Sequence, residues 1–372
     1  MGFEPFPHIE GFSQAVKQVR IRYKDLILPT LKLIGTVKMH GTNGSVIQRL
    51  KTNEFQYQSR NHVLTEGLDN FDFKKFITER NPQELFDIIR QTIQDNQNNQ
   101  NIQNIQNIQN NQNNHEVIDL NNYDIGIYGE FCGKAIQKKV AITGLEYFFV
   151  IFGIRLIPID SNNSIWYDME KMTHMKNHSK RIYNVYDFPV YTLDIDFNYP
   201  DKYEKEIMKL TDIVANECPV GKFFGISGPG EGIVWHLDKN NKNNKNDNFS
   251  LVFKSKSESF LPSTLNKMPK PDNIKNDNTI VDIFIMNTLT EYRLNQGIDY
   301  TKEMLYPEQL TTKTMGIFLK WIVEDILREE SDTIEEYNLK EDELKKLIPQ
   351  KAKRWFIQYL LMSNEQIQEN NI

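Results

Sequence analysis

The stretch KLIGTVKMHGTNGSVIQRL, residues 32–50, decides how the rest of the chain is interpreted. Its two ends, KLIGTVKMH and GSVIQRL, are short runs rich in Val, Ile and Leu, and such runs predict β-strands. Between them lies the polar segment Lys38-Met-His-Gly-Thr-Asn43. Because Gly41 has no Cβ, the backbone can turn there close to another group. The stretch therefore predicts two strands joined by a tight segment that carries a lysine, a histidine and an asparagine.

Strands of the same character continue as far as residue 256, and helical patterns interrupt them at Asn81–Gln94 and Tyr203–Glu217. The further strand-like runs are FQYQSR, IGIYGEF, YFFVIFGIRLI, FPVYTL, GIVWHL and LVFKSK. After residue 278, apolar residues instead recur at helical intervals. The sequence therefore predicts an α+β chain: antiparallel sheets with flanking helices over residues 1–268, a linker at 269–278, and a smaller all-helical domain over 279–372.

Two low-complexity tracts interrupt this pattern. Residues 95–114 are rich in Asn and Gln and hold too few apolar side chains to offset the entropy of ordering the chain. We expect a disordered surface insert there. Residues 239–248, KNNKNNKNDN, separate two strand-like runs and predict an expanded hairpin loop.

Composition narrows the class of protein. The 372 residues carry a net charge of −6, so any basic surface for nucleic acid must be local. Cys132 and Cys218 are the only cysteines and form no CxxC pair, which argues against a disulfide scaffold or a structural zinc site. The sequence has no apolar stretch of about 18 residues and no cationic segment followed by an apolar run at its start. We expect a soluble, monomeric protein of the cytoplasm or nucleus, without a secretory signal or a membrane partner.

Four segments carry the chemistry, and they occur in one order. They are Lys38-Met-His-Gly-Thr-Asn43, Tyr128-Gly-Glu130, Glu231-Gly-Ile-Val-Trp235 and Val252-Phe-Lys-Ser-Lys256. Each is weak alone, since such short pieces are also common in turns and amphipathic strands. Together, each on or beside a predicted strand, they resemble the nucleotidyltransferase motifs of polynucleotide ligases and mRNA-capping enzymes. The KxHGTN form is similar to that of the RNA ligase 2 family, whereas DNA ligases and capping enzymes tend to have KxDG.

This resemblance implies a nucleotidyltransferase (ATP-grasp-like ligase) fold that uses ATP as the AMP donor together with Mg²⁺ or Mn²⁺. Lys38 corresponds to the lysine that becomes adenylated. Glu130 corresponds to the acid that contacts the ribose hydroxyls, and Glu231 to an acid linked to the divalent metal. Lys254 and Lys256 correspond to the pair of lysines that binds phosphate.

The resemblance also suggests roles for four less distinctive residues. His40 and Asn43 correspond to residues that assist later steps, and Asn43 would lie near the metal, directly or through a water molecule. Arg60 occupies the place of an arginine that contacts phosphate and the nucleic-acid end, although a surface arginine in a hairpin is the alternative. Phe152 corresponds to the aromatic residue stacked on adenine, although the run Phe148–Phe152 is apolar throughout and leaves open which ring faces the base.

Two positions depart from the family pattern. Val37 stands where a glutamate commonly precedes the nucleophile, and Gly153 stands where an aspartate often follows the stacking aromatic residue. Neither change removes a group that acts on phosphate. We therefore expect the adenine contacts, rather than the chemistry, to differ.

The residue types fit the chemistry of adenylyl transfer. A lysine attacks phosphorus only as the neutral amine, and nearby positive charge favours that form. Lys254 and Lys256 alternate with Ser255, so both point to one face of a strand. There they can supply that charge and also stabilise the negative charge that builds on phosphate.

The predicted activity is the joining of 3′-hydroxyl and 5′-phosphate ends of RNA or RNA-containing duplexes. A capping-type guanylyltransferase and an inactive RNA-binding module of the same fold are the alternatives. The sequence leaves open whether nicked duplex RNA, RNA–DNA hybrids, broken tRNA or single-stranded ends are the substrate. It also leaves open whether the lysine-rich loop Lys134–Lys139 grips the RNA backbone or is only solvated.

Overall fold

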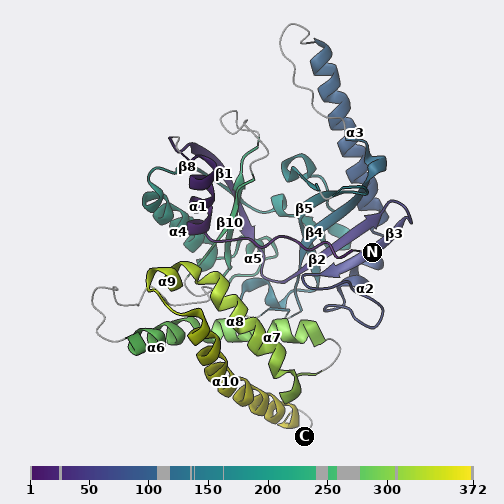
Figure 1. Ribbon diagram of the computed structural model, residues 1–372. Coiled ribbons are helices and arrows are strands. Elements are labelled where there is room, and N and C mark those ends of the chain that lie inside the picture. Colours follow the sequence, from purple (N-terminus) through teal and green to yellow (C-terminus); the bar gives the residue numbers. More distant parts are fainter. Residues whose placement is uncertain are drawn as a thin grey trace. The chain divides into compact units, whose positions relative to one another are not determined.

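The computed structural model describes residues 2–24, 27–106, 118–134, 136–137, 139–161, 163–239, 250–257, 277–305 and 309–369. The chain divides into two compact units, Met1–Ser257 and Glu258–Ile372 (Figure 1). The predicted boundary at residue 268 lies outside the described residues, so the predicted domain limits stay a prediction. Helix α6 begins at Asp277, inside the predicted linker.

Sheet A of the first unit contains the strand that leads to Lys38. It is antiparallel, with the strand order β10-β9-β1-β8. Its strands are β1 (Thr30–Lys38), β8 (Val190–Asp196), β9 (Gly232–Leu237) and β10 (Val252–Lys256). Strands β9 and β10 pair with each other, as predicted, and residues 240–249 of the predicted hairpin loop lie outside the described part of the chain.

Helices α1 (Phe12–Arg22) and α4 (Pro200–Asn216) pack against one face of sheet A (Figure 1). The ring centroid of Phe12 lies 5.2 Å from that of Phe253 on β10. Thr211 Oγ1 of α4 lies 2.7 Å from Ser255 Oγ on the same strand. Because side chains alternate along a strand, Lys254 and Lys256 point to the opposite face, as predicted.

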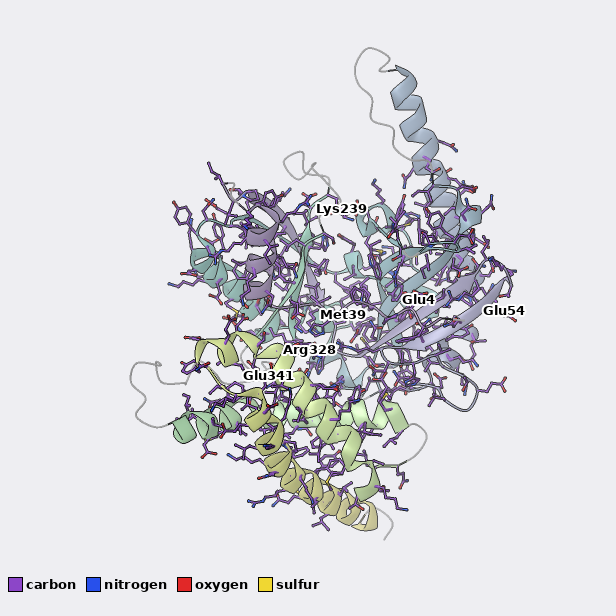
Figure 2. The ribbon with its side chains drawn as sticks, viewed as in Figure 1. Glu4, Met39, Glu54, Lys239, Arg328 and Glu341 are labelled. Carbon is purple, nitrogen blue, oxygen red and sulfur yellow. The ribbon has the colours of Figure 1, made fainter. Side chains whose placement is uncertain are left out.

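Sheet B follows directly in the chain, because only Met39–Gly41 separate β1 from β2. Its strand order is β3-β2-β4-β5-β6, and β7 pairs in parallel with β5. Its strands are β2 (Thr42–Arg49), β3 (Glu54–Ser59), β4 (Tyr123–Cys132), β5 (Phe148–Pro158), β6 (Ile165–Tyr167) and β7 (Ile182–Asn184). The buried side chain of Met39 marks the crossing between the two sheets (Figure 2).

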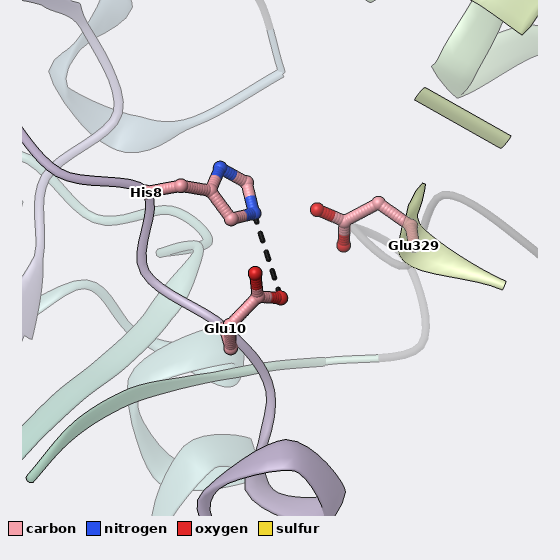
Figure 3. Close-up of side chains that lie close together, drawn as sticks. All are labelled: His8, Glu10 and Glu329. Carbon is pink, nitrogen blue, oxygen red and sulfur yellow. Dashed lines mark ion pairs between the residues drawn. The ribbon is translucent and has the colours of Figure 1, made fainter. Parts of the chain in front are cut away.

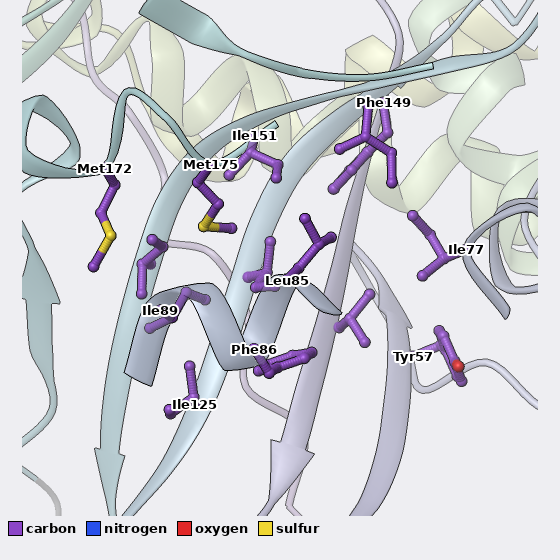
Figure 4. Close-up of a cluster of buried hydrophobic side chains, with 14 of the residues drawn as sticks. Tyr57, Ile77, Leu85, Phe86, Ile89, Ile125, Phe149, Ile151, Met172 and Met175 are labelled. Atoms are coloured by element: carbon purple, nitrogen blue, oxygen red, sulfur yellow. The ribbon is translucent and has the colours of Figure 1, made fainter. Parts of the chain in front are cut away.

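The main core of the first unit lies on one face of sheet B (Figure 4). Ile127 of β4 and Ile151 of β5 belong to it, together with Phe86 and Ile89 of helix α3. The short helix α2 (Phe73–Thr78) contributes Phe73. A second, smaller cluster contains the alternate strand residues Ile47 and Tyr128, so it lies on the other face of the sheet.

Helix α3 (Gln83–Gln106) extends into the Asn/Gln-rich tract that the sequence predicted to be disordered. Its first part is buried in the core, and the following polar side chains also find partners: Asn96 Nδ2 donates to Tyr167 Oη at 3.1 Å, and Gln97 Nε2 donates to Ile118 O at 3.1 Å. A helix that is already nucleated gains a backbone hydrogen bond for each residue added, which offsets the poor packing of Asn and Gln. Residues 95–106 thus belong to helix α3, residues 107–117 lie outside the described part, and the disordered insert over 95–114 stays a prediction.

The second unit is helical in its described residues, as predicted. Its helices are α6 (Asp277–Thr288), α7 (Glu291–Leu305), α8 (Met315–Glu329), α9 (Ser331–Glu336) and α10 (Glu341–Glu369). Phe284, Phe318, Ile322 and Phe356 form the centre of its core and are fully buried. The predicted α+β class, with antiparallel sheets and a helical C-terminal region, is confirmed. No helix among the described residues is both long enough and apolar enough to span a membrane.

Candidate active site

The last residue of β1, Lys38, and the last residue of β10, Lys256, lie on either side of Gly232. Strand β9 runs between β1 and β10, and Gly232 is the register partner of both lysines. Glu231 directly precedes Gly232, the first residue of β9. Strand pairing therefore places the Glu231 carboxylate between Lys38 and Lys256, which are more than 200 residues apart in sequence.

The Glu231 carboxylate contacts three cationic or polar side chains. Its Oε2 lies 2.7 Å from Lys38 Nζ and 2.9 Å from His40 Nδ1, and its Oε1 lies 2.8 Å from Lys256 Nζ. Only 2% of the Glu231 side chain is exposed, against 22% for Lys38 and 12% for Lys256. The two lysines thus remain accessible above a buried acid.

Electrostatics hold this acid ionised. Burial by itself raises the pKa of Glu231, but the positive charges of Lys256, Lys38 and His40 outweigh burial and hold its pKa well below the usual range. Glu231 is therefore a permanent anion that orients its partners rather than a group that takes up a proton.

Glu130 is a second, partly buried acid on β4, and it has a different character. Its Oε1 accepts a hydrogen bond from Gly41 N at 3.1 Å, and its register partner on β2 is Asn43. Burial raises the pKa of Glu130 to about 7, although the charge of Lys38 opposes the rise. The site therefore holds one permanently charged carboxylate and one that titrates near neutral pH.

Two glycines allow this arrangement. A Cβ at Gly41 would lie 2.2 Å from Phe131 O and 2.7 Å from Cys132 Sγ, so the segment after Lys38 can pass over β4 only with glycine. Gly232 has φ +157°, and a Cβ there would lie 2.0 Å from Ser255 O on β10. Cys132 is buried beneath Gly41 and is a free thiol.

Lys254 precedes Lys256 by two residues on the same face of β10, and its register partner is Val234. Between the two lysines, Ser255 Oγ accepts a hydrogen bond from Trp235 Nε1 at 3.0 Å inside the core. This buried anchor fixes the strand rotation that presents both lysines to the other face.

Glu231, Lys38, His40 and Lys256 form the Glu231 cluster. Two predicted site residues contact the N-terminal segment rather than this cluster. Arg60 follows β3, and its Nη2 lies 3.2 Å from Nδ1 of His8, whose Nε2 lies 3.7 Å from Glu10 Oε2 (Figure 3). Phe152 is only partly buried, and its ring meets the edge of Phe6 at a centroid distance of 4.9 Å. The rings of Phe148 and Phe149 are fully buried, so Phe152 is the phenylalanine of that run that a base can reach.

A model of the RNA ligase family matches residues 31–256, which is more than half of the chain and includes all four motif segments. The chain belongs to the RNA ligase family. A search of curated proteins finds no match.

Among solved structures, this RNA ligase family member is similar to RNA ligase of Naegleria gruberi at low identity. A mutant of that ligase with ATP and Mn matches with 18% identity and a TM-score of 0.36, over 68% of this chain and 56% of that chain. A mutant with AMP and Mn matches with 17% identity and a TM-score of 0.38, over 70% of this chain and 58% of that chain. The ligase with PPi matches with 18% identity and a TM-score of 0.37, over 72% of this chain and 61% of that chain. The chain thus spans less than two thirds of the Naegleria ligase chains.

Glu231 and Asn43 of this family member offer oxygen atoms that suit a Mg²⁺ ion whose other ligands are phosphate oxygens and water molecules. Mg²⁺ is usually held by one or two carboxylates together with phosphate oxygens and water. Glu231 supplies one buried carboxylate, and Asn43 can supply an amide oxygen beside Glu130. Because Lys38 and Lys256 contact both oxygens of Glu231, a metal ion would reach that acid only when one lysine moves aside.

Sequence reasoning missed several groups that contact or position the predicted site residues. Gly232, the register partner of both lysines, was named only as a member of the Glu231–Trp235 motif. Phe6 and His8 were overlooked because the N-terminal segment lacks a periodic pattern. Asn70, which is buried and donates from Nδ2 to Thr42 Oγ1 at 2.9 Å, also carries no local signal.

Proposed function

We propose that the chain is an ATP-dependent RNA ligase that joins a 3′-hydroxyl to a 5′-phosphate through a lysyl-AMP intermediate. The observation that carries the proposal is the meeting of Lys38 and Lys256 on the Glu231 carboxylate. A lysine nucleophile, a phosphate-binding lysine and a buried anion within direct contact are the parts that adenylyl transfer needs.

The reaction has three steps. Lys38 Nζ attacks the α-phosphorus of ATP, forming an N–P bond as the P–O bond to pyrophosphate breaks. The AMP group then passes to the 5′-phosphate of RNA, which restores the lysine amine. Finally the 3′-hydroxyl attacks the activated 5′-phosphate and AMP leaves. Such in-line transfers depend mainly on positioning and on stabilising charge.

Binding of ATP also changes the surroundings of the nucleophile in this proposal. In the resting arrangement, Glu231 shares its charge among Lys38, Lys256 and His40. The phosphates of ATP bring several negative charges and compete for Lys256 and Lys254. Binding of ATP therefore changes the electrostatic field around Lys38 and also brings the α-phosphorus to it.

The remaining site residues have supporting roles. We assign the ribose hydroxyls to Glu130, adenine to the accessible ring of Phe152, and the phosphate at the RNA end to Arg60. His40 and Asn43 assist the later steps. Mg²⁺ or Mn²⁺, near Glu231 and Asn43, would neutralise phosphate charge.

RNA or RNA-containing duplex ends are the proposed partner of a monomeric enzyme in the cytoplasm or nucleus. The two cysteines, both free and buried, suit such a reducing compartment.

Incubation with labelled ATP and Mg²⁺, followed by denaturing electrophoresis, tests the proposal. The wild-type chain should retain label, and Lys38→Ala should retain none, because the lysyl-AMP bond survives denaturation. Lys32→Ala is the matched control: Lys32 lies on the same strand and forms an ion pair with Asp238 at 3.3 Å, away from the cluster. Equal labelling of Lys38→Ala and wild type would exclude Lys38 as the nucleophile, and labelling by GTP instead of ATP would indicate a capping-type enzyme.

A further inference from the structure

We propose that Lys134 just after β4, the segment 176–183 and helix α5 (Pro219–Phe223) form a binding track for an unpaired RNA strand next to the site. The inference deepens the proposed function and rests on it. The track consists of Lys134, Lys176, His178, Arg181, Lys222 and Phe223.

The track is attached to the segments that carry Glu130 and Glu231. Lys134 follows Glu130 by four residues, at the end of β4. Farther along the chain, Ala141 N donates to Pro229 O at 2.9 Å, two residues before Glu231. The start of α5 is tied to the same turn, because Cys218 N donates to Gly228 O at 2.8 Å.

Direct contacts and a shared partner, Glu146, connect members of the track. Lys134 Nζ lies 3.1 Å from Glu146 Oε2, and Arg181 Nη2 donates to the backbone oxygen of Glu146 at 2.7 Å. Arg181 N donates to His178 O at 3.0 Å. Phe223 lies beyond, with its ring centroid 6.3 Å from that of His178. The track is thus one continuous surface from the end of β4 to α5.

Two exposed rings on the track have a rigid support. The side chain of His178 is 48% exposed, and Phe223 is also 48% exposed. His178 stacks on Tyr183 at a centroid distance of 4.8 Å, and Phe223 meets the edge of the same ring at 5.9 Å. Tyr183 itself is buried and also packs against Phe224. Exposed rings held from below are the usual stacking platform for unpaired bases.

Positive charge accompanies these rings. The side chains of Lys222, Lys134 and Lys176 are 74%, 48% and 38% exposed. Lys176 and His178 share the carboxylate of Asp187, which is only 3% exposed, so the anion lies below the surface and the cations lie at it. The other acids, Glu146 and Glu217, form exposed ion pairs, which are weak and which phosphate can replace.

An unpaired RNA strand fits this combination better than a protein does. Protein interfaces centre on a fully desolvated apolar core that is poor in charge. Here each exposed ring has a cation close by in the chain, as Lys222 precedes Phe223 and Lys176 lies two residues before His178. Cations beside isolated rings match alternating phosphates and bases.

The test measures binding of a 5′-phosphorylated single-stranded RNA by fluorescence anisotropy at several salt concentrations. Phe223→Ala should weaken binding about 10-fold, and Phe223→Trp should retain it, because a base can stack on either ring. Lys222→Ala should lower the slope of log K against log salt by about 1. Tyr199→Ala and Lys205→Ala are the controls: Tyr199 is 67% exposed, Lys205 is exposed, and both lie away from the track at helix α4.

Labelling of the same variants with ATP separates this inference from the proposed function. All of them should form lysyl-AMP at the wild-type level, because none contacts the Glu231 cluster. Unchanged RNA binding by both Phe223→Ala and Lys222→Ala would overturn the track even if labelling is normal, and an equal loss in the controls would do the same. A wild-type chain that binds single-stranded RNA but does not label would instead contradict the proposed function.

Discussion

At the scale of single residues, the site contains two acids, the buried Glu231 and the partly buried Glu130, whose pKa values shift in opposite directions. Glu231 meets three nitrogen atoms within hydrogen-bonding distance, whereas Glu130 accepts one backbone hydrogen bond from Gly41. The first stays charged because its partners outweigh desolvation, and the second is easily protonated because they do not. Two carboxylates with different partners thus show two different protonation behaviours within one site.

The titration of Glu130 makes the stability of the first unit depend on pH. Its pKa is about 7 in the folded chain, above the ordinary value of 4.5, so the folded state binds this proton more tightly. The resulting stabilisation is fully present below about pH 4.5 and is lost as the pH rises to about 7. Glu130→Gln, which keeps the acceptor for Gly41 N but carries no charge, should therefore exceed wild type in stability by up to about 3 kcal/mol at pH 8.

Urea unfolding of both proteins at pH 5 and pH 8 measures this difference. The advantage of Glu130→Gln should shrink strongly at pH 5, where the wild-type carboxyl is largely protonated in the folded chain. An advantage of equal size at both pH values would contradict the assigned titration.

At the scale of secondary-structure elements, the site depends on the register of three strands. Gly232 of β9 pairs with Lys38 of β1 and with Lys256 of β10. A shift of one residue in either pairing would turn a lysine to the helix-covered face of the sheet. Strand pairing therefore determines the chemistry as directly as the identity of the side chains.

Gly232→Ala should disturb this pairing. The added Cβ would lie 2.0 Å from Ser255 O, so β10 must move away. We expect a loss of about 2 kcal/mol in stability and a clear fall in labelling by ATP, since Lys256 moves with the strand. Gly144→Ala is the control, because a Cβ there meets no described atom within 4 Å. Labelling and stability of Gly232→Ala at the level of this control would contradict the role of the register.

In the second unit, a buried arginine joins three helices. Arg293 of α7 is fully buried, and its Nε donates to Asp325 Oδ2 of α8 at 3.0 Å. Its Nη2 donates to Glu330 Oε1 at 2.6 Å and its Nη1 to Thr288 O of α6 at 2.9 Å. The helices therefore share one polar junction inside an otherwise apolar core.

Removing this arginine should be costly, because it leaves buried acids with less positive charge. Arg293→Ala is expected to lower the free energy of unfolding of this unit by about 3 to 5 kcal/mol. Chemical denaturation followed by circular dichroism gives the value, with the exposed Arg354→Ala as the control. A loss below about 1 kcal/mol would show that the junction contributes little.

At the scale of the whole molecule, the proposed adenylation chemistry lies within one unit. All residues assigned to ATP lie within Met1–Ser257, and that unit contains its own hydrophobic core on sheet B. The helical unit likewise has a separate core around Phe318. Each unit therefore has the packing needed to fold independently.

A fragment of residues 1–257 should accordingly form lysyl-AMP with labelled ATP. Its labelling should require a divalent metal and disappear with a chelator, as for the full chain. The same fragment with Lys38→Ala is the control. A fragment that folds, as judged by circular dichroism, but does not label would indicate that the helical unit takes part in the first step.

The sequence predicted the parts of the fold that rest on local patterns. Alternating apolar residues revealed the strands, and the neighbouring β9 and β10 were correctly paired because little chain separates them. The meeting of Lys38 and Lys256 on Glu231 was expected only from the family resemblance. Its geometry depends on strand pairs far apart in sequence, and no local periodicity encodes such a register.

Two further features were beyond sequence reasoning for physical reasons. The N-terminal segment follows no period, yet Tyr128 Oη donates to Glu4 O at 2.9 Å and holds this segment on sheet B. The helical part of the Asn/Gln-rich tract is stabilised by the buried first turns of α3, which a composition average does not register. Tertiary contacts decided both outcomes.

The pairing of β9 with β10 also bears on how this gene can change. Residues 240–249 connect these strands at the ends near His236 and Val252, whereas Lys256 pairs at the far end. Repeated Asn and Lys codons gained or lost in frame would alter only this connection, at about 0.6 kcal/mol for each doubling of its length. Lineages can therefore differ widely in such repeats while the distance between the two lysines stays the same.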